Sequence, residues 1–179
     1  MSYDIFCYKS KIGVPDVEEA QIVIEREDER ENMVQGAKLS DLKLSIVNAL
    51  MSYNSNLEVF GISDGEVDDD FKSIEIEHTE VEFNLQIFIH DDMVSFNLPY
   101  HLNSKKAESI FHFINEYIKI IGKTAGYFVF DPQLGLAYDP TQAQHNGLNK
   151  YLAVRKNMTC SLSSPNLFQS KKKPWWKIW

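Results

Sequence analysis

The sequence feature that most constrains the fold is an alternation of apolar and polar residues over positions 80–100. Apolar side chains occupy every second position over residues 81–89 and again over 94–98, on either side of Asp91-Asp92. Because successive side chains of a strand point to opposite faces, this pattern predicts two antiparallel strands that share one apolar face. The rest of the chain has to supply the elements that cover that face.

A third strand is predicted over residues 71–77, with Ile74 and Ile76 on the apolar face. The apolar positions change from even to odd numbers between this strand and the next one. Since a shift of one residue turns every side chain over, a turn or bulge near His78-Thr79 has to absorb the change. The three strands together form a meander.

An amphipathic helix predicted over about residues 104–121 is the natural cover for the meander. Asn103 or Ser104 provides the N-cap, and Gly122 follows where a left-handed residue can end the helix. We interpret its apolar stripe as core rather than as a cofactor-binding surface. The stripe repeats at helical spacing: Ala107, Ile110, Phe111, Ile114, Tyr117, Ile118 and Ile121.

Weaker patterns complete the predicted fold. They indicate an N-terminal strand over residues 2–9, a helix that begins near Pro15, a helix over 40–53 and a β-hairpin over 127–138. The predicted class is therefore α+β. An antiparallel sheet, built from the central meander 71–100, the hairpin and the N-terminal strand, is packed by helices.

Charge divides the chain near residue 140. All 26 acidic residues fall between Asp4 and Asp139, where 11 lysines and arginines leave a net charge of −15. From Pro140 onward there are seven basic residues and no acidic one, and the whole chain carries −8. We therefore predict a single acidic α+β domain over residues 1–140 and a basic C-terminal extension over 141–179 with an aromatic end.

The chain of 179 residues is long enough to bury a core without a disulfide or a metal ion. Its opening residues lack the basic and apolar regions of a secretion signal, and no stretch approaches the ~18–20 apolar residues of a transmembrane helix. We therefore expect a soluble cytoplasmic protein in which Cys7 and Cys160 are reduced thiols.

Sequence motifs for catalysis, cofactor binding or metal binding are missing from the chain. The eight glycines occur singly, without a P-loop or a dinucleotide-binding fingerprint. Asp91-Asp92 and Asp131 are interpreted as turn residues rather than as catalytic carboxylates. The five histidines are scattered without the spacing of a zinc site: His78, His90, His101, His112 and His145. We therefore predict no catalytic residue, no cofactor and no metal ion.

Two acidic clusters contain too few apolar residues to belong to the core, and they supply the candidate partner-binding residues. The first lies within residues 25–31, which form either a solvated helix end or loop or an acidic contact surface. The second lies in the polar loop 63–70, whose carboxylates lack the spacing of a calcium-binding loop. The candidates are Glu25, Glu27, Asp28 and Glu29 in the first cluster and Asp68, Asp69 and Asp70 in the second.

The chain ends in the basic and aromatic sequence KKKPWWKIW, which has three interpretations. We favour docking of Trp175, Trp176 and Trp179 on the protein's own acidic domain, because three exposed tryptophans are unfavourable in a soluble protein. Binding of lipid headgroups and contact with a partner protein are the alternatives. Nucleic-acid binding is not expected, since a charge of −15 over residues 1–139 repels phosphate.

Several segments resemble known groups of proteins. The opening MSYDIFCYK, followed by Glu18-Glu19-Ala20, looks like the start of small bacterial proteins. The segment YFVFDPQLGLAYD at 127–139 and the basic, Trp-rich end are similar to features of immunity proteins encoded beside polymorphic or secreted toxins. This resemblance implies a non-enzymatic protein that binds and neutralises a cognate, cytoplasm-acting bacterial toxin.

The acidic charge is compatible with that expectation. Toxins that cut nucleic acid carry basic clefts, and an acidic surface is steered toward them and can occupy them. Two other classes of function remain open. One is a small hydrolase or transferase whose site is assembled only in three dimensions, and the other is a peripheral membrane adaptor that uses the tail.

Overall fold

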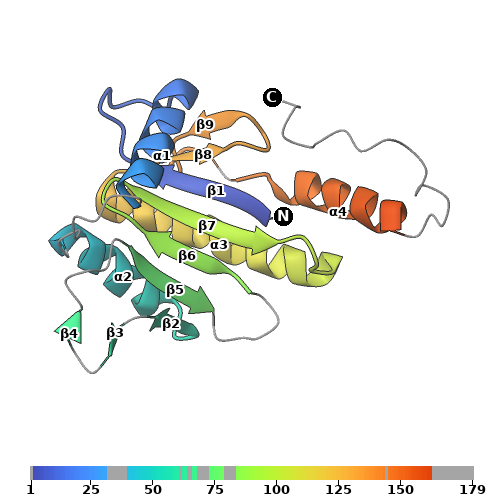
Figure 1. Cartoon of the computed structure of the whole chain (residues 1–179), viewed down its shortest axis with the longest axis horizontal. Helices are drawn as coiled ribbons and strands as arrows, with labels where there is room; N and C mark the ends of the chain where they lie inside the picture. Colours follow the sequence, from blue (N-terminus) through green and yellow to red (C-terminus); the bar gives the residue numbers. More distant parts are fainter. Residues whose placement is uncertain are drawn as a thin grey trace.

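The computed structural model describes residues 2–31, 40–60, 62–63, 66–67, 73–78, 84–143 and 145–162. The predicted α+β class is confirmed, because within these residues four helices pack around an open sheet of seven antiparallel strands (Figure 1). In order across the sheet, the strands are β2 (Leu57–Phe60), β5 (Ile74–His78), β6 (Gln86–Ile89), β7 (Met93–Pro99), β1 (Ser2–Tyr8), β8 (Phe128–Asp131) and β9 (Leu136–Tyr138). A separate pair joins β3 (Ile62–Ser63) and β4 (Glu66–Val67).

The predicted meander is confirmed as three adjacent strands, β5, β6 and β7. Ile76 pairs with Ile87, which in turn pairs with Phe96, and all three side chains are buried in the main core. The change of apolar parity is therefore real, since the buried positions are even in β5 and odd in β6. The connection over residues 79–83 lies outside the described residues, together with its predicted strand positions.

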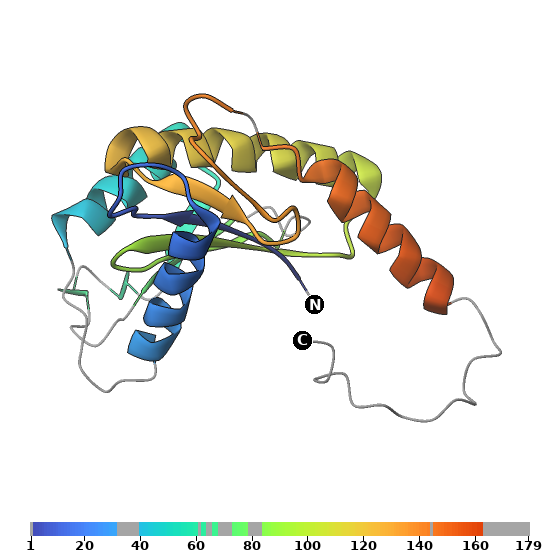
Figure 2. The same cartoon turned by 90° about the horizontal axis from the view of Figure 1, so that it is seen from above.

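The main core lies between the sheet and two helices, α2 (Asp41–Tyr53) and α3 (Ser104–Ala125), on one face (Figure 2). All seven residues of the predicted stripe are buried there, and the side chain of Asn103 accepts the N–H of Lys106 as an N-cap. The predicted helix end is wrong. Gly122 lies inside α3 against Pro140, and Gly126 ends the helix with φ of 70°.

The other face of the sheet is covered only in part, by α1 (Val17–Glu31). A second apolar cluster joins α1 to β1, β7 and β8, and its buried members are Tyr8, Ala20, Val23, Met93 and Phe130. Figure 2 shows α1 on the side of the sheet opposite α3. Strand β1 therefore contacts apolar groups on both of its faces, as a central strand does.

The core extends past residue 140, where the acidic domain was predicted to end. Tyr151, from helix α4 (Leu148–Leu162), is fully buried in the main core. Its hydroxyl donates to the carbonyl of Pro99 at 2.6 Å and accepts the N–H of Leu102 at 3.2 Å. The change of charge near residue 140 thus does not mark the edge of the packed structure. No described helix is both long and apolar enough to cross a membrane.

Candidate functional site

On the side of the sheet that faces away from α2 and α3, helix α1 covers only part of the surface. No described helix covers the remaining part (Figure 1). We call this surface the open face. The strand register arranges its side chains in two cross-strand rows. The first row is Glu58, Glu77, Gln86, Asn97 and Asp4, and the second is Phe60, Glu75, Phe88 and Ser95.

The open face is strongly acidic. Its two rows contain four carboxylates, and the seven strands of the sheet, all within the described residues, contain no lysine or arginine. Glu58 lies directly opposite Glu77, an arrangement in which like charges destabilise a strand pair. Burial, followed by repulsion from Glu77, raises the pKa of Glu75. A basic group bound here would relieve this repulsion.

One neutral side chain organises these acids. The amide of Gln86 donates to Glu75 Oε1 and to Glu77 Oε1, both at 3.2 Å. The amide therefore holds two carboxylates of neighbouring rows in place without neutralising their charge. No salt bridge among the described residues involves Glu58, Glu75 or Glu77.

A concavity of about 270 Å³ continues the first row at the start of β6 and the end of β7. Glu77, Gln86 and Asn97 line it together with His101. Pockets for small-molecule ligands usually measure about 300–1,000 Å³. The concavity therefore suits one inserted side chain of a partner better than a cofactor.

The predicted partner-binding residues fall into three groups. Glu25, Asp28 and Glu29 are exposed on α1, as expected for a contact surface. Glu27 differs, because it is only 4% exposed and one carboxylate oxygen lies 3.9 Å from the Nε of Arg26. Asp68, Asp69 and Asp70 lie outside the described residues. The same holds for the residues predicted to dock the tail on the domain, Trp175, Trp176 and Trp179.

Sequence reasoning missed the carboxylates of the open face. A signal for them exists in the sequence, because Glu75 and Glu77 alternate with Ile74 and Ile76. Alternation places the glutamates together on the face opposite the core. What the sequence lacks is the strand order that brings Glu58 and Asp4 into the same row.

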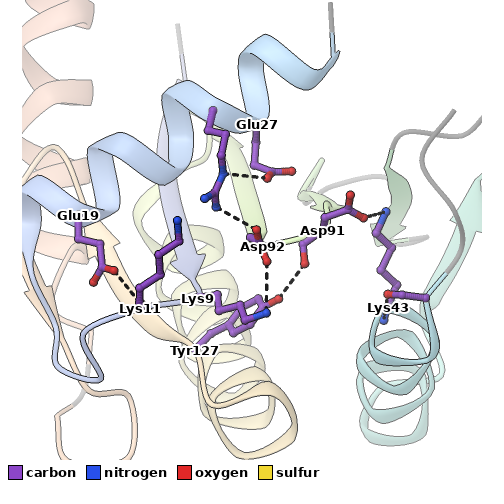
Figure 3. Close-up of polar contacts among 10 residues, drawn as sticks. Lys9, Lys11, Glu19, Glu27, Lys43, Asp91, Asp92 and Tyr127 are labelled. Carbon is purple, nitrogen blue, oxygen red and sulfur yellow. Dashed lines mark hydrogen bonds and ion pairs between the residues drawn. The ribbon is translucent and has the colours of Figure 1, made fainter. Parts of the chain in front are cut away.

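The Asp91-Asp92 turn between β6 and β7 connects helices on both sides of the sheet (Figure 3). Asp91 Oδ1 lies 2.7 Å from the Nζ of Lys43 on α2, whose side chain is only 3% exposed. Asp92 Oδ2 accepts a hydrogen bond from the guanidinium of Arg26 on α1 at 2.9 Å, and Lys9 Nζ lies 3.5 Å from Asp92 Oδ1. These acids are turn residues, as predicted, but they also fix α1 beside the open face.

His90, next to this turn, is a buried histidine held in its neutral form. Burial and then the positive charge of Lys43 lower its pKa from 6.5 to about 4, against the opposing effect of Asp91. The unfolded chain therefore binds more protons than the folded one between these two values. The free energy of unfolding is therefore highest above pH 6.5, and it decreases as the pH falls from 6.5 toward 4.

We expect this histidine to lower the free energy of unfolding by about 2 kcal/mol between about pH 7 and about pH 5. His90→Gln should reduce the slope of stability against pH, while His112→Gln, at an exposed position, should leave it unchanged. Urea titrations across this pH range measure the slope. Equal slopes in the two variants would contradict the assignment.

A buried polar network joins β1, β8 and the segment before α4. The hydroxyl of Tyr3 donates to Asp131 Oδ2 at 2.5 Å, and His145 Nε2 lies 3.4 Å from the same oxygen. His145 Nδ1 lies 3.0 Å from the hydroxyl of Tyr138. Burial lowers the pKa of His145, although the charge of Asp131 opposes this effect.

This network contains the residue types of a catalytic site, but the burial of its side chains indicates a structural role. Nδ1 of His145 is within hydrogen-bond distance of the Tyr138 hydroxyl, whereas Nε2 lies 3.4 Å from Asp131 Oδ2 and makes no hydrogen bond to a described residue. The side chains of His145 and Asp131 are 0% exposed. A general base needs a nitrogen within reach of the substrate. Asp131 also accepts the N–H of Leu134, which is the turn role predicted for it. The network therefore links β1, near the start of the chain, to β8 and to the segment before α4.

Within the described residues, no group of three or more His, Cys, Asp or Glu side chains is arranged to hold a metal ion. Comparisons with known proteins do not supply an identity, because no family model, no curated protein and no solved structure matches the chain. The functional interpretation of the open face therefore depends on its geometry and charge alone.

Proposed function

We propose that this chain is a non-enzymatic immunity protein that binds and neutralises a cognate bacterial toxin with a basic surface. The observation that carries the proposal is the open face, where four carboxylates lie on strands without a lysine or arginine. Such a concentration of one charge, with an unrelieved Glu58–Glu77 pair, costs stability and is explained by a positively charged partner.

Two acidic surfaces border the same side of the molecule. Helix α1 lies on the side of the sheet that carries the open face, and its outward acids include Glu25, Asp28 and Glu29 (Figure 2). The Asp92–Arg26 ion pair holds α1 there. A basic cleft approaching this side meets carboxylates from both elements. In the cytoplasm such a surface would increase the rate of encounter with a nucleic-acid-cutting toxin and then occupy its substrate site.

The test is the association rate with the toxin encoded by the adjacent gene, measured at low and high salt. Reversing two charges of the open face, in Glu58→Lys with Glu77→Lys, should slow association about tenfold at low salt and flatten the salt dependence. Reversing Glu25, Asp28 and Glu29 together should have a similar effect. Glu108→Lys, on the exposed side of α3, is the matched control and should change the rate little.

Unchanged rates in both sets of variants would remove these surfaces from the interface. If no adjacent gene product binds and the purified chain turns over a small substrate, the enzyme alternative would replace the proposal. Binding to anionic vesicles in place of a protein would favour the membrane adaptor. Thermal melting of each variant separates loss of binding from loss of fold.

A further inference from the structure

The open face is acidic and partly aromatic, so a basic, aromatic occupant is complementary to it. Phe60 is 52% exposed, and Phe88, in the same row, is half-buried beside Glu75. Lysine side chains pair with carboxylates and also lie favourably over aromatic rings. Tryptophan adds a large apolar surface whose burial against phenylalanine is favourable.

We propose that the occupant is the C-terminal segment of the same chain, residues 163–179. This segment has four lysines and no acidic residue, and it contains all three tryptophans of the protein. Its charge and aromatic content are thus complementary to the two rows of the open face. This proposal concerns an intramolecular contact and does not depend on the proposed toxin partner.

The path of α4 delivers this segment to the correct side of the sheet. The helix begins beside α3, and Tyr151 anchors its first turns to the main core. From there α4 (Leu148–Leu162) slants away from α3, outside the ends of β1 and β7 and toward the side of the sheet that carries α1 (Figure 2).

A fully extended segment is longer than the sheet is wide. Seventeen residues can extend over roughly 56–60 Å at the length of an extended chain. Seven strands spaced about 4.8 Å apart span only about 29 Å. Because the segment is covalently attached, its effective concentration at the face is on the order of millimolar, which favours binding even through weak contacts.

Two other occupants, a second copy of the chain and a lipid surface, fit the charge less well. A second copy of the chain that used the same face in a symmetric dimer would place Glu58, Glu75 and Glu77 against their own equivalents. Anionic lipid headgroups would meet the same repulsion at this surface. A basic toxin would bind the same carboxylates as the segment, and it would therefore have to displace the segment.

Tryptophan fluorescence of the full chain tests this proposal, because every tryptophan lies in the segment. In the wild type we expect blue-shifted emission and protection from acrylamide quenching. Glu58→Gln with Glu77→Gln should shift the emission to the red and raise the quenching constant roughly twofold, as high salt should in the wild type. Phe60→Ser should have the same effect with all carboxylates retained. Glu18→Gln with Glu108→Gln removes two exposed charges elsewhere and should change nothing.

Three outcomes would overturn the proposal. Emission and quenching that are the same in the wild type and in both open-face variants would place the tryptophans elsewhere. A dimer mass in light scattering, with emission that depends on protein concentration, would assign the face to a second copy. Emission that shifts to the blue only when phosphatidylserine vesicles are added would assign the segment to a membrane. No toxin is present in these measurements, so failure here is distinct from failure of the immunity proposal.

Discussion

Replacement of Phe111 or Ile114 by aspartate is expected to lower the free energy of unfolding by about 3–5 kcal/mol, enough to abolish a marginally stable fold. Both side chains lie in the main core between α3 and the sheet, with exposed fractions of 3% and 0%. A carboxylate at either position would be buried without a partner or would have to be protonated. Chemical denaturation monitored by circular dichroism measures the loss.

The control for this prediction lies on the same helix. Ser109→Asp introduces the same charge at an exposed position of α3 and should change stability by less than about 0.5 kcal/mol. If the core variants unfold at the same denaturant concentration as Ser109→Asp, the helix does not cover the sheet as described.

Removal of the Asp131 carboxylate is expected to have the second largest effect, a loss of about 3 kcal/mol. Asp131→Ala leaves the hydroxyl of Tyr3 and the N–H of Leu134 without their acceptor, and it removes the charge beside His145. The burial of Asp131 makes these losses costly, because water cannot replace the missing oxygen.

The chain contains a matched control for this change, since Asp139 also precedes a proline. Its carboxylate caps a turn in an exposed setting, where it accepts the N–H of Thr141. Asp139→Ala should therefore cost only about 1 kcal/mol. Equal losses in the two alanine variants, measured by urea unfolding, would show that the buried network contributes no more than an ordinary turn.

Local patterns in the sequence predict the elements on the main core well. The stripe of α3 and the alternation in β6 and β7 are each contained in one continuous segment, and burial on one face determines their period. The same reasoning failed at Gly122, where a glycine was interpreted as the end of α3. Gly122 is instead required by the close approach of Pro140, a contact that no local pattern records.

Features that depend on the order of strands could not be predicted in this way. Successive apolar residues in β1, from Ile5 to Tyr8, are typical of a strand buried on both faces. The pattern does not predict which strands pair with β1. The acidic rows of the open face arise only when β2, β5, β6, β7 and β1 are placed side by side. The buried Lys43 was likewise unexpected, because its partner Asp91 lies in a turn 48 positions away.

The central position of β1 has a consequence for how the protein is made. This strand leaves the ribosome before the other described strands of the sheet, yet Ser2 pairs with Pro99 and Phe6 pairs with Phe130. At a synthesis rate of about 5–20 residues per second, the strand waits on the order of ten seconds for its second neighbour. During that time its apolar side chains lack the strands that flank them in the folded protein. The two halves of the sheet can therefore join only after the chain has been synthesised as far as β7 and β8.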